Sequence, residues 1–360
     1  MPNNLFRDIP TLMELNPKHN INFFESSNTT GITSTFGNTG QSSQGKWWGG
    51  VLAPNGKIYG MPLNSTTVLE IDPITRTTST FPSSSRGCAG GVLAPNGKIY
   101  GIPASSSFQV LEINPITRTT SSFGSGGTYI GGVLAPNGKI YGIPNDARKQ
   151  VLEIDPITRT TSTFGTITST YSGVEGGVLA PNGKIYGIPS GNNGLMLEID
   201  PVARTTSLFS GGSSGTYYAG GVLAQNGKIY CVPYDGAFIS SMPILVIDPI
   251  ARTTSTFGSI PIAPSPPYDP PRNRGGVLAP NGKIYCMPYN VVYSKILEID
   301  PLNNSFSSIT NPGGSYAGGV LAPNGKIYGI PYTAVTILEI STGCAHKPAL
   351  SLLGPYNNKF

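Results

Sequence analysis

The sequence predicts an all-β fold, a seven-bladed β-propeller of four-stranded antiparallel blades, and three observations predict it. The segment Gly-Gly-Val-Leu-Ala-Pro-Asn-Gly-Lys-Ile-Tyr begins at Gly49 and recurs six more times, once with Gln in place of Pro. Most copies start 41 to 45 residues after the one before, which is the length of a four-stranded propeller blade. Only 11% of the residues are charged, while 47 are Gly and 33 are Pro, as short strands joined by tight turns require. The six further copies begin at Gly90, Gly131, Gly176, Gly220, Gly275 and Gly318.

The first half of each unit is a β-hairpin. In the first unit, Gly49–Ala53 is a short apolar segment that we call strand a, and Lys57–Pro62 is strand b. Pro54-Asn55-Gly56 lies between them. Pro suits the first corner of a type I turn and Gly suits the left-handed position that follows, so we expect a three-residue hairpin loop. The paired glycines are expected where the blades converge on the axis and only small residues fit.

The second half of each unit is a further hairpin. Val68–Asp72 is predicted as strand c, and Thr77–Phe81, which is rich in β-branched residues, as strand d. Between them, Asp72 can accept backbone hydrogen bonds in a turn, and Pro73 pre-sets its own φ. The order from axis to rim is therefore a, b, c, d.

The ends of the repeated region predict how the ring closes. The last unit has strands a, b and c, but it continues into Ser341-Thr342-Gly343-Cys344 without a strand d. The N-terminal part contains candidates for the missing strand, either Ile32–Phe36 or Ile21–Phe24. We expect one of these to complete the last blade, which removes the exposed sheet edge at the seam.

The predicted organisation has three parts. Residues 1–30 form an N-terminal extension with a degenerate c–d hairpin, residues 31–341 form the propeller, and residues 342–360 form a tail without repeat character. We find no apolar segment typical of a secretory signal or a membrane span, and the compartment stays open.

Charge and cysteine usage exclude two classes of site. The formal net charge is +5, but the basic residues mostly occupy repeated positions and form no cluster, so a nucleic-acid partner is not expected. The four cysteines, Cys88, Cys231, Cys286 and Cys344, have no zinc-site spacing. Four free thiols are expected, with a Cys88–Cys344 disulfide as the alternative.

The two faces of the predicted disc differ within this one chain. The a–b and c–d turns lie on one face and are nearly identical from blade to blade, so we call it the uniform face. The b–c and d–a links lie on the other face and differ in every blade, so we call it the variable face. Variable loops on a rigid framework are where binding residues usually lie, and aromatic anchors among small polar residues are typical of recognition surfaces. The candidate ligand contacts are aromatic residues of the variable links: Trp47, Trp48, Tyr129, Tyr171, Tyr217, Tyr218, Tyr268, Tyr316, Tyr234, Tyr289 and Tyr332.

Repeated charged residues are interpreted as framework. A Glu recurs in strand c of six blades, with Val246 in the fifth, and a Lys recurs in strand b of all seven. We expect each Glu to pair across the strands with Lys or Thr. Asp72, Asp155, Asp200 and Asp248 each precede an Arg by four residues and are expected to form turn-capping pairs with it.

No catalytic set stands out. The two histidines, His19 and His346, lie outside the repeats, and no glycine-rich phosphate loop occurs. The sequence therefore predicts a protein that is not an enzyme, with no cofactor and no metal.

Two repeated units resemble known propeller families. Ala-Pro-Asn-Gly-Lys-Ile-Tyr resembles the strand–turn–strand unit of NHL-type and streptogramin-lyase-type propellers, and Ile-Asp-Pro-Ile-Thr-Arg is similar to the hairpin of kelch-type and PQQ-type propellers. The likeness covers roughly residues 32–340 and implies the propeller architecture. Streptogramin-type lyases use a His and metal-binding acids on one face. No His lies within these repeats, so that activity is not carried over.

Three functional hypotheses follow. The first is a non-enzymatic propeller that binds a glycan or a protein through the variable face. The second is a structural or interaction subunit of a larger assembly, such as a virion or a cell-surface complex. The third is an enzyme with its site at the axial opening.

Overall fold

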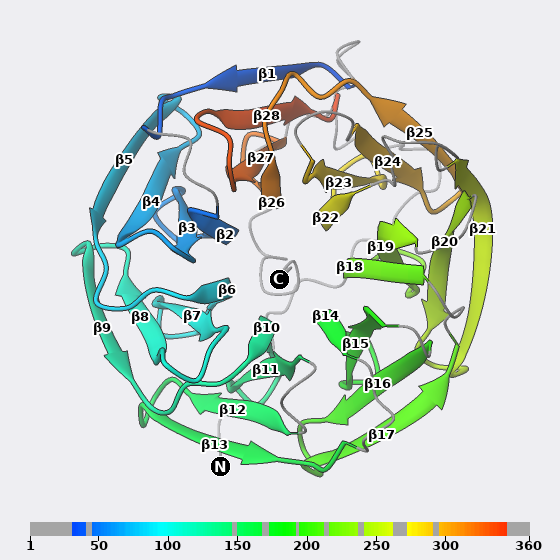
Figure 1. Ribbon diagram of the computed structural model, residues 1–360, viewed down its shortest axis with the longest axis horizontal. Helices are drawn as coiled ribbons and strands as arrows, with labels where there is room; N and C mark the ends of the chain where they lie inside the picture. The colour runs from blue at the N-terminus through cyan, green and yellow to red at the C-terminus, as the bar shows by residue number, and fades with distance from the viewer. Residues whose placement is uncertain are drawn as a thin grey trace, which may run out of the picture.

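The computed structural model describes residues 31–40, 45–145, 150–167, 173–191, 194–211, 216–236, 241–261, 272–290 and 295–343. These residues form seven four-stranded antiparallel sheets arranged in a ring around a central axis (Figure 1). The predicted seven-bladed, all-β propeller is confirmed. No helix in the described ranges could cross a membrane. The domain limits at residues 30 and 342 stay predictions, because nearly all residues beyond them lie outside the described ranges.

Each blade contributes one strand to each of four concentric layers (Figure 1). The innermost strands are β2 (Trp47–Leu52), β6 (Cys88–Leu93), β10 (Tyr129–Leu134), β14 (Val174–Leu179), β18 (Thr216–Leu223), β22 (Asn273–Leu278) and β26 (Tyr316–Leu321). The second strands are β3 (Ile58–Pro62), β7 (Ile99–Pro103), β11 (Ile140–Pro144), β15 (Ile185–Pro189), β19 (Ile229–Gly236), β23 (Ile284–Pro288) and β27 (Lys326–Pro331). The third strands are β4 (Thr67–Asp72), β8 (Val110–Asn114), β12 (Val151–Asp155), β16 (Leu195–Asp200), β20 (Ser241–Asp248), β24 (Ile296–Asp300) and β28 (Ile337–Ser341). The outermost strands are β5 (Thr77–Pro82), β9 (Thr119–Phe123), β13 (Thr160–Phe164), β17 (Thr205–Ser210), β21 (Thr253–Pro261), β25 (Ser305–Ile309) and β1 (Thr33–Phe36). We number the blades 1 to 7 in the order of their innermost strands.

Blade 7 takes its outermost strand from the opposite end of the repeated region. Strand β1 pairs antiparallel with β28, with Thr33 opposite Ile340 and Phe36 opposite Ile337. This is the first of the two strands considered for that role. The other, residues 21–24, lies outside the described residues.

The glycine pair within each innermost strand has two separate causes. The first glycine has a positive φ, 71° at Gly49, beside a register shift in the β2–β3 pairing. Glycine adopts this left-handed conformation without strain, which a residue with a Cβ atom does not. The second glycine packs against the preceding blade: a Cβ on Gly50 would lie 2.5 Å from Cδ1 of Ile330. Crowding at the axis, the cause expected from the sequence, is therefore only part of the explanation.

At six of the seven junctions, a buried tyrosine joins one blade to the next on the uniform face. The Tyr59 hydroxyl accepts a hydrogen bond from the Asn55 side chain at 2.9 Å. It also donates toward the carbonyl oxygen of Pro115, in the c–d turn of blade 2, at 3.0 Å. The same tyrosine-to-turn contact recurs at five other junctions, so the repeated turns bind one another around the ring. The partners there are Tyr100 with Pro156, Tyr141 with Pro201, Tyr186 with Pro249, Tyr230 with Pro301, and Tyr328 with Pro73.

The repeated Glu and Lys form an ion pair at this junction, as expected. Lys57 Nζ lies 2.9 Å from Oε1 of Glu70, and the Glu70 side chain is almost fully buried. Burial alone would raise the pKa of Glu70, but the hydrogen bond and charge of Lys57, the charge of Arg118 and the hydrogen bond from Tyr59 together hold it below its ordinary value. The repeated acids are therefore part of the framework.

The repeated arginines do not pair with the turn aspartates, contrary to the expectation from the sequence. Asp72 instead accepts hydrogen bonds from the backbone amides of Ile74 and Thr75. The arginine of each c–d turn reaches back to the preceding blade. Arg118 Nε lies 3.4 Å from Oε2 of Glu70, and its guanidinium lies 5.2 Å from the centre of the Phe81 ring.

Five of these arginines have a left-handed backbone, with φ between 54° and 56°. This conformation costs a residue with a side chain roughly 1–2 kcal/mol. The contacts with Glu and Phe across the junction offset that cost. The equivalent residue in blade 6 is Asn304, whose φ is 48°, and Asn tolerates this region best among non-glycine residues.

The core lies between neighbouring blades as seven similar clusters. One contains Val51, Tyr59 and Met61 of blade 1 with Cys88 and Ile99 of blade 2. Cys88, Cys231 and Cys286 are buried free thiols, and burial raises the pKa of Cys88 to about 12. Cys344, the proposed partner of Cys88 in the alternative, lies outside the described residues.

The junction predicts the outcome of a double-mutant cycle. Glu112→Val alone removes the acceptor of Lys98 and Arg159 and is expected to lower the free energy of unfolding by about 1–3 kcal/mol. Adding Arg159→Asn, which relieves the left-handed strain at φ 56°, is expected to recover part of this loss. Urea unfolding of the wild type, the two single variants and the double variant measures the coupling free energy between Glu112 and Arg159. A neutral Glu112→Val variant would contradict the framework role.

Candidate functional site

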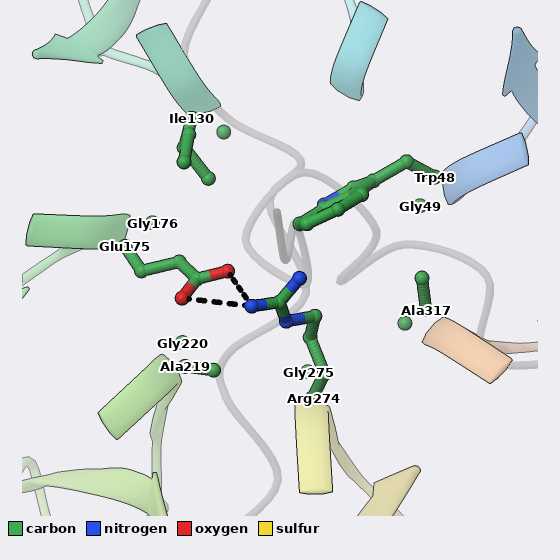
Figure 2. Close-up of a pocket in the computed structure, with 12 residues that line it drawn as sticks. Trp48, Gly49, Ile130, Glu175, Gly176, Ala219, Gly220, Arg274, Gly275 and Ala317 are labelled. Carbon is green, nitrogen blue, oxygen red and sulfur yellow. Dashed lines mark hydrogen bonds and ion pairs between the residues drawn. The ribbon is translucent and has the colours of Figure 1, made fainter. Parts of the chain in front are cut away.

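The position before each glycine pair points into the axial opening at the variable face. In the seven blades it holds Trp48, Ala89, Ile130, Glu175, Ala219, Arg274 and Ala317. Six of these residues, all but Ala89, line a cavity of only about 10 Å³, which has room for about one water molecule. Figure 2 shows Glu175, Arg274 and Trp48 projecting into the opening from different blades. These three side chains close the opening at this level, so a ligand of any size would contact them from the mouth.

Glu175 and Arg274 form an ion pair across the axis (Figure 2). Glu175 belongs to β14 and Arg274 to β22, two blades further along, and Nη2 of Arg274 lies 2.9 Å from Oε1 of Glu175. The side chains are 9% and 13% exposed, respectively. Burial raises the pKa of Glu175, and the Arg274 charge and a hydrogen bond with Ser190 offset only part of that rise.

Three aromatic rings, those of Trp48, Tyr234 and Tyr289, surround the Arg274 guanidinium, and the ring of Tyr332 packs against two of them. We call these four residues the aromatic cluster. The guanidinium lies 4.3 Å from the Trp48 ring centre, 4.5 Å from that of Tyr234 and 4.3 Å from that of Tyr289. These separations are within the range of cation–π attraction.

The cluster is continuous from ring to ring. Tyr289 and Tyr332 have ring centres 4.8 Å apart, and Trp48 meets Tyr332 edge-to-face at 5.9 Å. Burial raises the pKa of Tyr289 far above its ordinary value, so its hydroxyl stays protonated. All four rings are half-buried. They come from blades 1, 5, 6 and 7, so they form one arc of the mouth.

The structure separates the other candidate residues into three groups. Trp47, Tyr129, Tyr218 and Tyr316 are buried, each two positions before a glycine pair, and their rings fill the space between blades. Tyr217 is half-buried in the innermost strand β18 of blade 5. Tyr171 and Tyr268 lie outside the described residues.

The sequence carried a signal that separates the two tryptophans. Successive side chains of a strand point to opposite sides, so Trp47 faces the neighbouring blade when Trp48 faces the axis. Trp47 Nε1 donates a hydrogen bond to the Thr67 carbonyl at 2.8 Å, as a buried Trp requires. Sequence reasoning missed Glu175 and Arg274. Comparing the residue before each glycine pair across blades would have found them, since they are the only two charged residues at that position.

No protein-family model and no curated protein matches this chain in sequence. Solved structures do match its fold. Virginiamycin B lyase from Staphylococcus aureus has a TM-score of 0.69 at 12% identity, covering 86% of this chain and 99% of the lyase. A streptogramin B lyase has a TM-score of 0.68 at 11% identity, covering 86% of this chain and 97% of that one.

An extracellular domain of a two-component system protein from B. thetaiotaomicron is also similar. It has a TM-score of 0.64 at 8% identity, covering 87% of this chain and 43% of the other. The chain is thus a seven-bladed propeller repeat protein with the fold of the streptogramin-lyase type. At these identities the likeness shows the fold alone.

These comparisons correct the prediction that the protein is not an enzyme. Its propeller fold is the one that virginiamycin B lyase, an enzyme, also has, so an argument from the repeat architecture against catalysis fails. A variant of that lyase in which a histidine is replaced by alanine is catalytically inactive. No histidine lies among the described residues here, and no group of three His, Cys, Asp or Glu in them could hold a metal ion.

The buried ion pair predicts a pH-dependent stability. Arg274→Met leaves Glu175 buried without its counter-charge, and we expect a loss of about 3–5 kcal/mol in the free energy of unfolding at pH 7. The folded state of this variant binds a proton to Glu175 more tightly than the unfolded state, where the pKa is about 4.3. Its deficit should therefore shrink as the pH falls from 7 to 5.

Thermal unfolding at several pH values measures this effect. The matched control is Arg274→Met with Glu175→Gln, which should recover most of the loss at pH 7 because no buried charge remains. A deficit that is equal at pH 7 and pH 5 would show that the ion pair is not the cause.

Proposed function

We propose that the variable face binds a protein partner and that the aromatic cluster at the axial mouth anchors it. The observation that carries the proposal is the composition of this cluster: one Trp, three Tyr and one Arg from four blades meet around a single point. Trp, Tyr and Arg are the residues that dominate binding energy at protein interfaces, where they sit in desolvated central patches.

Ring packing favours a protein over a glycan. A sugar stacks best on an open aromatic face, but Trp48 has the Arg274 guanidinium 4.3 Å from its ring centre and the Tyr332 ring 5.9 Å away. The cluster offers ring edges and phenolic hydroxyls to a partner instead. The buried Arg274–Glu175 pair beneath it holds the rings in place, so little ordering entropy is lost when a partner binds.

Removing two rings tests this proposal. Wild-type protein and a Trp48→Ala/Tyr332→Ala variant are presented in parallel to a peptide-display library and a glycan array. We expect peptides that compete for one site on the wild type and lose at least about 2 kcal/mol, roughly 30-fold, on the variant.

The control for this experiment is Ile74→Ala on the uniform face, where Ile74 is 76% exposed and should contribute nothing. If glycans bind to the wild type and not to the variant, the variable face recognises sugars rather than a protein. Binding of neither class, or binding that the variant retains, would end the proposal.

A second candidate, acid–base catalysis at the axial mouth, is favoured by Glu175. Burial raises the pKa of this carboxyl above its ordinary value, and a raised carboxyl pKa is a feature of general acids and bases. It faces the opening rather than a neighbouring blade, as Figure 2 shows.

Quinupristin, which is bound to the inactive lyase variant in one matching structure, serves as the test compound for this candidate. If Glu175 is catalytic, mass spectrometry should detect conversion of quinupristin by the wild type and a loss of at least about 100-fold in rate with Glu175→Gln. Arg274→Lys is the companion variant, since it keeps the positive charge beside the carboxyl. Intact quinupristin after incubation with the wild type would dismiss this candidate for that substrate.

A further inference from the structure

One junction between blades departs from the repeat at three positions at once. Gln225 replaces the proline of the a–b turn in blade 5, Val246 replaces the strand-c glutamate of the same blade, and Asn304 replaces the turn arginine of blade 6. All three line a single cavity of about 540 Å³ between blades 5 and 6 on the uniform face. This volume is within the range of roughly 300–1,000 Å³ that small-molecule sites occupy.

The preceding junction shows what normally fills this space. Between blades 4 and 5, the Arg252 guanidinium lies 5.3 Å from the Phe209 ring centre, and its Nε lies 3.3 Å from Oε2 of Glu198. At the departing junction the short Asn304 side chain replaces the arginine, and the Phe257 ring lines the cavity. Part of this cavity is therefore space that an arginine side chain occupies at other junctions.

Three polar side chains at this junction, Gln225, Ser255 and Asn304, are solvent-exposed, and the serine lacks the partner that it has in other blades. The serine equivalent to Ser255 donates a hydrogen bond to the strand-c glutamate in other blades, as Ser207 does to Glu198 at 3.3 Å. Val246 offers no acceptor to Ser255. Within the described ranges, the side chains of Ser255, Gln225 and Asn304 make no hydrogen bond, and all three line the cavity.

Charge in the cavity favours a neutral ligand. A cation would meet Lys228, and the glutamate that neutralises arginine at other junctions is absent. Lys228 Nζ lies 3.6 Å from Oδ2 of Asp248, so its charge is already partly balanced, and Asp300 also lines the cavity and would repel an anion.

The remaining surface is half apolar and half hydrogen-bonding. Phe257 and Val246 supply an apolar wall, while Gln225, Ser255 and Asn304 supply amide and hydroxyl groups that both donate and accept. A molecule that matches both the apolar wall and the hydrogen-bonding groups has a face of C–H groups and a rim of hydroxyl groups. We propose that this cavity is a binding site for a neutral saccharide unit, on the opposite face from the aromatic cluster and independent of the function proposed for that cluster.

Restoring the repeat at this junction tests the site. Val246→Glu with Asn304→Arg rebuilds the pair found at other junctions and should narrow the cavity while the protein keeps its fold. The probes are methyl α-mannoside, methyl β-galactoside, methyl α-fucoside, N-acetylglucosamine and lactose, followed by saturation-transfer NMR. We expect transfer to the C–H protons of at least one sugar on the wild type and at least a roughly tenfold weaker Kd on the double variant.

Further variants make the outcome decisive. Trp48→Ala should bind the sugar as the wild type does, which separates this site from the axial mouth. Gln225→Pro, which restores the turn of the other six blades, and Ser255→Ala should each weaken binding and serve if the double variant does not fold. Methyl glucuronide and N-acetylarginine amide serve as the negatively and positively charged comparison probes. The proposal is overturned if no neutral sugar binds, if narrowing the cavity leaves binding unchanged, or if only one of the two charged compounds binds.

Discussion

A buried tyrosine hydroxyl, bonded to a turn carbonyl of the next blade, is the interaction on which the rest of this ring depends. A phenol of this kind cannot be buried without partners, so the asparagine of the a–b turn and the glutamate of strand c are fixed around it. The buried glutamate then requires a lysine from its own blade and an arginine from the next. That arginine must adopt a left-handed backbone to reach it. The residues that recur in most blades are thus links of one dependent chain of contacts.

This dependence explains why the fold was readable from the sequence. Pro54-Asn55-Gly56 predicts a turn, the short segments on either side of it predict strands, and the recurrence of both predicts blades. What the sequence did not reveal is where a long side chain reaches. Arg159 lies four residues after the turn aspartate Asp155, yet its partner is Glu112 in the preceding blade. The spacing along the chain suggests a pair within one hairpin, but packing of the blades in the ring brings the arginine close to the glutamate of the preceding blade.

The candidate site was partly predictable for the same reason. Trp48 could be singled out because it adjoins a glycine pair and is unlike its equivalents. Glu175 and Arg274 are 99 positions apart and become neighbours only because the ring returns to its axis. The sequence alone suggested that Trp47, Tyr129 and Tyr316 are surface anchors. Because successive side chains of a strand point to opposite sides, these three rings are instead buried between neighbouring blades. The site is a property of the closed ring, and one blade read alone does not contain it.

The pairing of β1 with β28 also determines the order in which the molecule is assembled. The partners Ser34 and Glu339 are 305 positions apart, so six blades are synthesised before the seventh has its outer strand. Closing so long a loop carries a large entropic cost, and contacts of such sequence separation slow folding. Until β28 has been synthesised, β1 is a strand without a sheet, and until the two strands pair, β28 has an open edge. The seam is therefore both the slowest joint to form and the place where two incomplete copies would exchange strands.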